Sequence, residues 1–334
     1  MNLFPTQYST LSSTALNERI KEAYNINNTT TRLLLRGVSD TYLVTDKSPK
    51  YILKIYRNCH RSFDEIQGEV ELLNILRKNN AKVSFPISDA KGNYIQKFNT
   101  AEGSRYGVLF SYAEGKASNN LTKNQIRIVG QEMAFNHNIT SSINLKHNRP
   151  EYTIFSTLHK PLEILNSAFI EYHYDTGYEY LKAISEKTIK RFKLIDTTSF
   201  NYGYCHYDYL PKNFHFNEKD QFTLFDFDFA GKGYLVNDLM SFQVHCFFQI
   251  LYGGMSKDDS NTCMEVFINA YRERREISNQ ELEAIPYLGI MFWIYYLAIQ
   301  YNGYDDFSNN YFNLTYLKKW VNWIEQWEGL YCKF

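Results

Sequence analysis

The stretch from Cys205 to Gly231 limits the possible folds of this chain more than any other part of its sequence. It reads CHYDYLPKNFHFNEKDQFTLFDFDFAG and combines an H-x-D-x-x-x-x-N pattern with a D-x-D pattern near its end. The polar residues of the two patterns are His206, Asp208, Asn213, Asp226 and Asp228. Either pattern alone is a weak signal, because D-x-D also occurs in glycosyltransferases and in ordinary turns, but the combination is more specific.

A β-hairpin is predicted between the two patterns. The runs 214–216 and 222–225 have the composition of short strands, and the polar residues 217–220 that join them suit a turn. Asn213 would stand at the entry of this hairpin and Asp226 at its exit. Two oxygen-bearing side chains that are distant in sequence are therefore expected side by side.

These residue types suit phosphoryl transfer from a nucleotide. In such a reaction the protein positions a hydroxyl group, holds Mg²⁺ on the phosphates and offsets the developing charge. Asn213 and Asp226 would supply the hard oxygen donors that Mg²⁺ prefers, and Asp208 can orient the hydroxyl and accept its proton. Asp228 is predicted either to contact the metal or only to tie the loop.

The spacing of His206, Asp208 and Asn213 is that of a kinase catalytic loop, and the stretch resembles the aminoglycoside phosphotransferase and choline kinase family. The resemblance implies an α+β fold of the bilobal protein-kinase-like type, with an N-terminal antiparallel sheet plus helix and a larger, mainly helical C-terminal lobe. We expect the lobes at 1–112 and 113–334. The family also implies ATP and Mg²⁺ as cofactors and a small-molecule hydroxyl as the acceptor.

Length, charge and cysteine content fit such an enzyme. The chain has 334 residues, above the size at which a single core usually keeps growing, and a formal net charge of +0. A neutral balance gives no general attraction to nucleic acid or to an anionic membrane. The five cysteines form no C-x-x-C pattern, and no signal peptide is recognisable. We expect a cytoplasmic protein that binds neither nucleic acid nor membrane.

A strand lysine and a helix glutamate form a second predicted feature. The run Tyr51–Tyr56 has strand character and carries Lys54 in its apolar surroundings. The following helix begins with a capping box, Ser62 and Glu65, and Glu69 falls within its apolar stripe. A buried carboxylate needs a partner, so we pair Glu69 with Lys54. In the family that YILKIYR and GEVELLNIL resemble, this pair holds the α- and β-phosphates.

Two further nucleotide contacts are predicted from position alone. The turn at Gly37 and Ser39 lies where a kinase folds a loop over the phosphates, although it does not match G-x-G-x-x-G and would otherwise be a plain hairpin turn. The strand-like run from 106 to 112 resembles the connector between lobes. The main chain near Phe110 and Tyr112 would then meet the adenine.

Around the catalytic loop, the resemblance assigns supporting roles. His206 would brace the loop, and Asp238 would hold it from behind. Lys212 either reaches the γ-phosphate or faces solvent. Tyr207 stands where eukaryotic protein kinases have an arginine, and the short distance to Asp238 leaves no room for a long activation segment, so regulation by loop phosphorylation is not expected.

The C-terminal part is predicted to be helical and rich in aromatic residues. Its most apolar run, Tyr287–Ile299, is too short to span a membrane and is read as a buried helix. Several aromatic residues could form a face for a cationic acceptor or could simply be core. They are Trp293, Tyr295, Tyr296, Tyr301 and Tyr304.

Two alternatives to a small-molecule kinase remain. A bacterial stress-type protein Ser/Thr kinase would share this layout. A catalytically silent nucleotide-binding regulator would usually lack one of the key residues, yet Lys54, Asp208, Asn213 and Asp226 are all present. The acceptor and the oligomeric state cannot be read from the sequence, because pocket shape rather than fold sets the substrate.

Overall fold

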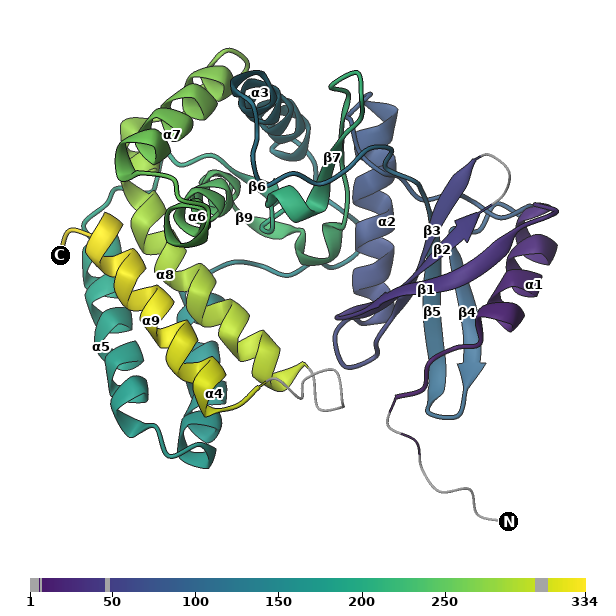
Figure 1. Cartoon of the computed structure of the whole chain (residues 1–334), viewed down its shortest axis with the longest axis horizontal. Helices are drawn as coiled ribbons and strands as arrows, with labels where there is room; N and C mark the ends of the chain where they lie inside the picture. The colour runs from purple at the N-terminus through teal and green to yellow at the C-terminus, as the bar shows by residue number, and fades with distance from the viewer. Residues whose placement is uncertain (1–5, 7, 46–48, 304–311) are drawn as a thin grey trace.

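The computed structural model describes residues 6, 8–45, 49–303 and 312–334, which form a β-rich N-terminal lobe and a mainly helical C-terminal lobe (Figure 1). Helix α2 (Phe63–Lys78) lies between the sheet and the C-terminal helices in this view. This arrangement confirms the predicted fold class. The predicted division between residues 112 and 113 stays a prediction.

One antiparallel sheet organises the N-terminal lobe, with the strand order β1-β2-β3-β5-β4. Its elements are α1 (Ser13–Tyr24), β1 (Thr30–Arg36), β2 (Ser39–Thr45), β3 (Lys50–Tyr56), β4 (Ile95–Thr100) and β5 (Gly103–Ser111). Side chains alternate along β3, so Leu53 and Ile55 join the core under α1, whereas Tyr56 joins the core on the α2 side. Lys54 shares the side of Tyr56 and therefore faces α2.

Helix α2 forms as its sequence predicts. The Ser62 side chain accepts a hydrogen bond from the Glu65 amide, and the Glu65 side chain accepts one from the Ser62 amide, which confirms the capping box. Glu69 lies on the buried face of the helix and is 1% exposed. Gly68 precedes it at a point where a loop of the C-terminal lobe, Asn148–Arg149, approaches closely.

The C-terminal lobe is built mainly from helices, and the strands found in its described residues lie around the catalytic stretch. The helices are α3 (Lys123–Thr140), α4 (Lys160–Glu171), α5 (Asp175–Phe192), α6 (Val236–Tyr252), α7 (Lys257–Arg272), α8 (Asn279–Asn302) and α9 (Leu314–Tyr331). The strands are β6 (Tyr202–Cys205), β7 (Phe214–Phe216), β8 (Phe222–Leu224) and β9 (Gly231–Tyr234). The β7–β8 hairpin was predicted, and the β6–β9 pair was not. Because Cys205 pairs with Gly231, the two ends of the catalytic stretch are held together.

The β7–β8 hairpin also joins the two lobes. The Leu224 amide donates to the Lys82 carbonyl (2.9 Å), and the Phe216 and Lys116 main chains exchange two hydrogen bonds (3.2 and 3.3 Å). Gly115 makes the second contact possible, because it has φ +104° and a Cβ there would lie 2.2 Å from the Phe216 carbonyl oxygen. The hairpin is thus bonded both to the segment after α2 and to the segment after β5.

Helix α8 is long and apolar enough to cross a membrane by length and composition, but 72% of its most apolar window is buried inside the protein. Trp293 and Tyr296 are 2% and 8% exposed, as core residues are. Tyr304, which was grouped with them, lies outside the described residues. The structure therefore favours the core interpretation for the buried members of the aromatic group.

The close approach at Gly68 generates a stability prediction. A Cβ at this position would lie 2.4 Å from the Asn148 carbonyl oxygen and 2.9 Å from the Arg149 side chain. We expect Gly68→Ala to lower the free energy of unfolding by about 1–3 kcal/mol, despite the better helix propensity of alanine, because α2 must shift. Chemical denaturation would measure this.

Gly329→Ala in α9 is the matched control, since a Cβ there meets nothing within 4 Å. This variant should be as stable as the wild type or more stable by up to about 1 kcal/mol. Equal behaviour of the two variants would contradict the proposed contact at Gly68.

Candidate active site

Lys54 lies at the meeting point of the two lobes. Its ammonium is 2.9 Å from Asp226 Oδ1, 3.6 Å from Asp228 Oδ2 and 3.7 Å from Glu69 Oε1. The lysine and Glu69 are therefore neighbours, as predicted, although the shortest contact is to the D-x-D segment. The main-chain amide of Phe225 donates a hydrogen bond to the main-chain carbonyl oxygen of Asn213 (2.8 Å). This bond brings Asn213 beside Asp226, so the two predicted metal ligands are also close.

Burial and charge act in opposite directions on this cluster. Burial alone lowers the pKa of Lys54, but the carboxylates of Asp226, Asp228 and Glu69 outweigh it and raise that pKa well above its ordinary value. Burial alone raises the pKa of Asp228, but Lys54, His60 and Arg61 hold it well below its ordinary value. Lys54 is therefore a cation and Asp228 an anion at neutral pH.

Asp228 is enclosed by the turn between β3 and α2. Arg61 Nε is 3.2 Å from Asp228 Oδ1, and the Arg61 guanidinium also donates to the Asp228 carbonyl at 2.7 and 3.0 Å. His60 Nε2 lies 3.2 Å from Asp228 Oδ2, and burial lowers the pKa of this histidine. Asp228 is fully buried. Its contacts hold the D-x-D segment against the N-terminal lobe.

Arg149 holds the same segment from the other lobe. Its guanidinium donates to the carbonyls of Phe227, Asp228 and Ala230, each at 2.7 Å. It also donates to the Glu65 carbonyl at 2.8 Å and lies 3.7 Å from Glu69 Oε2. This arginine therefore joins α2 to the D-x-D segment directly.

The catalytic loop presents Asp208 with its two carboxylate oxygens in different surroundings. Oδ2 accepts from Asn213 Nδ2 at 2.8 Å and lies 2.8 Å from Lys212 Nζ. Oδ1 is buried and has no hydrogen-bond partner within the described part of the chain. Because the Asn213 amide nitrogen faces Asp208, its carbonyl oxygen is free to face elsewhere.

Asp238 at the start of α6 holds the loop from behind. Its carboxylate accepts from the main-chain amides of His206 (2.9 Å) and Tyr207 (2.6 Å), and His137 Nε2 lies 2.9 Å away. Tyr207 has φ +66°, which is uncommon for a residue with a large side chain. The His206 ring lies 3.0 Å from the Phe225 carbonyl oxygen. These contacts fix the backbone just before Asp208.

The positional predictions are placed as follows. Gly37 lies in the turn between β1 and β2, where its amide donates to the Ser39 carbonyl at 3.0 Å. Phe110 lies in β5. The Ser111 amide donates to the Phe85 carbonyl, and the Ser111 carbonyl accepts from the Ser84 hydroxyl. The amide of Tyr112, in contrast, has no protein acceptor among the described residues. The roles of these residues in nucleotide binding stay predictions.

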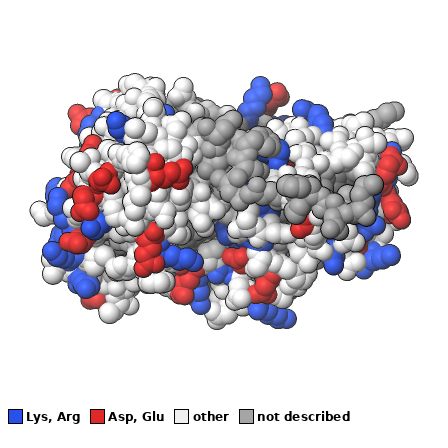
Figure 2. All heavy atoms as spheres, turned by 90° about the horizontal axis from the view of Figure 1, so that it is seen from below, with Lys and Arg blue, Asp and Glu red and all other residues white. Residues whose placement is uncertain are grey.

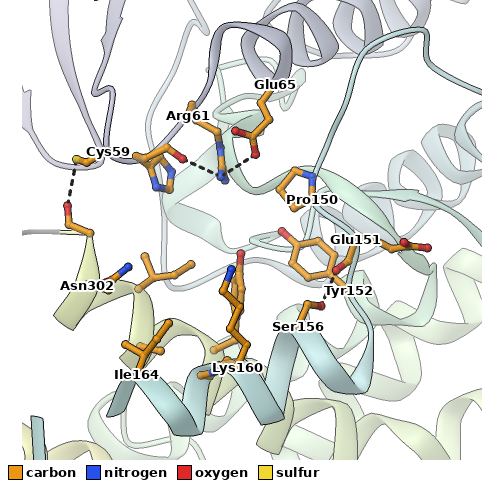
Figure 3. Close-up of a pocket in the computed structure, with 16 residues that line it drawn as sticks. Cys59, Arg61, Glu65, Pro150, Glu151, Tyr152, Ser156, Lys160, Ile164 and Asn302 are labelled. Atoms are coloured by element: carbon orange, nitrogen blue, oxygen red, sulfur yellow. Dashed lines mark hydrogen bonds and ion pairs between the residues drawn. The ribbon is translucent and has the colours of Figure 1, made fainter. Parts of the chain in front are cut away.

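A cavity of about 310 Å³ lies beneath the β3–α2 turn, between the lobes (Figure 3). Its walls are polar at the turn, where Arg61 and Glu65 point toward it, and mixed on the α4 and α8 side, where Ile164 and Lys160 lie. Tyr152 forms part of the wall, donates to the Phe229 carbonyl oxygen and stacks on Tyr207 with ring centroids 3.5 Å apart. The cavity is thus one aromatic ring away from the catalytic loop.

Charge elsewhere on the molecule is mixed. On the face seen from below, basic and acidic side chains are interspersed rather than separated (Figure 2). Among the described residues, no group of three or more His, Cys, Asp and Glu side chains is arranged to hold a metal. The candidate metal ligands are instead one aspartate and one asparagine.

Sequence reasoning missed several residues of the site. Arg61, His60 and Arg149 carry no motif, and they act by reaching main-chain oxygens or a distant carboxylate. His137, in α3, is buried between Asp238 and Tyr271. Its place in a helical pattern gave no sign of these partners.

The model of the phosphotransferase enzyme family matches residues 30–271 of this chain, which include every predicted site residue. The chain belongs to this family. The family assignment confirms the predicted resemblance and the prediction of a kinase-type enzyme.

Among curated proteins, this phosphotransferase is 27% identical over 325 residues to an uncharacterized protein of Deinococcus radiodurans, covering 97% of this chain and 92% of that one. It is 23% identical over 282 residues to the amicoumacin kinase of Bacillus subtilis, covering 79% and 77%.

Solved structures show the same fold. An amicoumacin kinase in complex with AMP-PNP, Ca²⁺ and Ami has a TM-score of 0.76 at 18% identity, covering 95% of this phosphotransferase and 94% of that chain. A microcompartment-associated aminopropanol kinase has a TM-score of 0.72 at 19% identity, covering 94% and 95%.

The role of Asp238 generates the second prediction. Asp238→Asn replaces one acceptor oxygen by an NH₂ group that must face a main-chain N–H or His137. We expect the free energy of unfolding to fall by about 1–3 kcal/mol, with a loss of turnover because the amides beside Asp208 lose their partner. Denaturant unfolding and ADP release would measure the two effects.

Asp258→Asn, on the exposed surface of α7, is the control and should change neither the stability nor the turnover by much. Wild-type stability in Asp238→Asn would contradict this account.

Proposed function

We propose that this protein is an ATP- and Mg²⁺-dependent kinase that phosphorylates a hydroxyl group of a small molecule. The observation that carries the proposal is that Lys54 contacts Asp226 and that Asp208 contacts Asn213, which lies beside Asp226, in a chain of the phosphotransferase enzyme family. All four residues that phosphoryl transfer would need are present. This argues against a silent nucleotide-binding regulator.

The residues that would hold Mg²⁺ are Asp226 and Asn213. Asp226 is 44% exposed at its side chain, and the Asn213 carbonyl oxygen is not turned toward Asp208, so both offer hard oxygen donors. Mg²⁺ usually completes its coordination with substrate phosphates and water, which fits a set of only two protein ligands. When bound, Mg²⁺ would neutralise charge on the phosphates. Asp228, which is buried and enclosed by cations, would tie the segment in place.

Lys54 would bind the nucleotide phosphates. Its ammonium contacts Asp226 more closely than Glu69, so phosphate oxygens and Asp226 compete for it. On nucleotide binding, Lys54 would exchange Asp226 for phosphate and keep Glu69, which frees Asp226 for the metal. The main chain near Phe110 and Tyr112 would meet the adenine, and the Gly37–Ser39 turn would cover the phosphates.

Asp208 would orient the acceptor. Oδ2 is already bound by Asn213 and Lys212, so Oδ1 is the oxygen that can accept the hydroxyl proton. We propose the cavity beneath the β3–α2 turn as the acceptor site. Its volume of about 310 Å³ is at the lower end of the range typical of small-molecule pockets, roughly 300–1,000 Å³. A concave pocket of this size favours a small molecule over a protein serine. The relatives named amicoumacin kinase and aminopropanol kinase act on small molecules, which supports the same conclusion.

The proposal is tested by measuring ADP release over a panel of amines, amino alcohols, sugars and antibiotics. At least one should be phosphorylated, and EDTA should stop turnover until Mg²⁺ is restored. Asp208→Asn keeps the shape of the side chain but removes the base, so turnover should fall by about 10²–10⁴-fold while ADP affinity is kept.

Asp220→Asn, at the exposed turn of the hairpin, is the matched control and should retain full activity. Undiminished turnover in Asp208→Asn would exclude Asp208 as the base. Label from ATP that enters proteins of a lysate, with no small molecule phosphorylated, would favour the protein-kinase alternative.

The acceptor cavity gives a separate prediction. Ile164→Trp would fill part of the cavity and should raise KM for the acceptor by roughly tenfold or more, because an added ring displaces bound substrate from the wall. KM for ATP should not change. Ile170→Trp, on the exposed side of the same helix, should leave both KM values unchanged. An unchanged acceptor KM in Ile164→Trp would place the acceptor elsewhere.

A further inference from the structure

We propose that Lys212 is a second phosphate-binding lysine of this active site, whose ammonium holds Asp208 and binds the phosphoryl group while it passes from ATP to the acceptor. The inference rests on the proposed function and adds a residue whose identity neither catalytic motif specifies. Lys212 occupies one of the variable positions of H-x-D-x-x-x-x-N, so its identity is not required by the pattern.

The first observation is the contact itself. Lys212 Nζ lies 2.8 Å from Asp208 Oδ2, and Asp208 is 3% exposed. An ion pair between two exposed side chains contributes little, but here one partner is the buried carboxylate at the centre of the site. The ammonium is therefore held at the position where the acceptor hydroxyl and the transferred group must meet.

The second observation is that the Lys212 ammonium has N–H donors beyond the one that Asp208 can accept. An ammonium has three N–H donors, and within the described part of the chain Asp208 is the carboxylate paired with it. The Lys212 side chain is 59% exposed, so its stem reaches the loop from the surface rather than being locked in the core. It can turn toward a second anion without unpacking the protein.

The third observation is the place of Lys212 in the loop. It directly precedes Asn213, a predicted metal ligand, and its ammonium is paired with Asp208, the predicted base. The lysine therefore belongs to the same site as both groups. The γ-phosphoryl group must occupy this same region, because it is transferred to a hydroxyl held by Asp208.

The chemical step is a simple displacement. A bond forms between the acceptor oxygen and the γ-phosphorus as the bond from that phosphorus to the β,γ-bridging oxygen breaks. The hydroxyl proton passes to Asp208 Oδ1, and ADP leaves. Lys212 would donate a hydrogen bond to a non-bridging oxygen of the transferred group. The ammonium would offset the negative charge of that oxygen only during transfer. Such a contact lowers the barrier more than it strengthens the binding of ATP.

A purely structural brace predicts something different. If Lys212 only held Asp208 in place, its loss would affect Mg²⁺-ADP alone and Mg²⁺-ADP with a mimic of the transferred group to the same extent. A phosphate-binding lysine instead affects the mimic selectively. The two readings can therefore be separated by binding measurements that need no knowledge of the acceptor.

The experiment compares wild type, Lys212→Met, Lys212→Arg and the control Lys219→Met, which lies at the exposed hairpin turn. Calorimetry gives the affinity of each protein for Mg²⁺-ADP and for Mg²⁺-ADP with aluminium fluoride, a mimic of the transferring phosphoryl group. We expect Lys212→Met to lose roughly 10²-fold in affinity for the fluoride complex with little change for ADP. Lys212→Arg should restore most of the loss, and Lys219→Met should match wild type.

An affinity ratio in Lys212→Met within about threefold of the wild-type ratio would overturn the proposal. A parallel loss of both affinities would also overturn it in favour of the brace. If the wild type itself binds neither complex, the proposed kinase function fails, and this inference fails with it. Thermal unfolding of all four proteins shows whether each variant is folded.

Discussion

The buried ammonium of Lys54 is the interaction on which the two lobes depend. An unpaired charge in this position would be very costly, and Lys54 is surrounded by carboxylates from α2 and from the D-x-D segment. Three carboxylates, Glu69, Asp226 and Asp228, are in turn balanced by three cations, Lys54, Arg61 and Arg149. Removing any one of them leaves three charges of one sign facing two of the other. The relative position of the lobes is therefore set by charge pairing as well as by the hairpin that joins them.

The catalytic loop is held from two sides by different chemistry. On the nucleotide side its neighbours are charged, and on the opposite side Asp238 accepts two main-chain amides and contacts His137. These hydrogen bonds fix the backbone just before Asp208 without using the Asp208 side chain. The positive φ of Tyr207 is stabilised there, while the Asp208 side chain, one residue later, contacts Asn213 and Lys212. Rigidity and reactivity are thus supplied by separate groups.

The sequence predicted those parts of the site that depend on local pattern. The hairpin, the capping box of α2 and the inward position of Glu69 each follow from a few consecutive residues, and all three are present. The strand pair β6–β9 was missed because its members are only four residues long and lie far apart in the sequence. Arg61, His60 and Arg149 were missed for a related reason. Their partners are main-chain carbonyls and a carboxylate more than 70 residues away, and no composition or periodicity records such contacts.

Lys54 and Lys212 solve the same electrostatic problem at two ends of the site. In the proposed site, the carboxylates of Asp226 and Asp208 would both lie close to the phosphates, where like charges repel. Each is paired with a lysine, at 2.9 and 2.8 Å. Under the proposed function, phosphate oxygens would compete with these carboxylates for the lysines, so nucleotide binding would release Asp226 toward the metal and loosen the hold on Asp208. Because only Lys212 is largely exposed, it is the partner that can move during transfer, whereas Lys54, buried against Glu69, keeps its place.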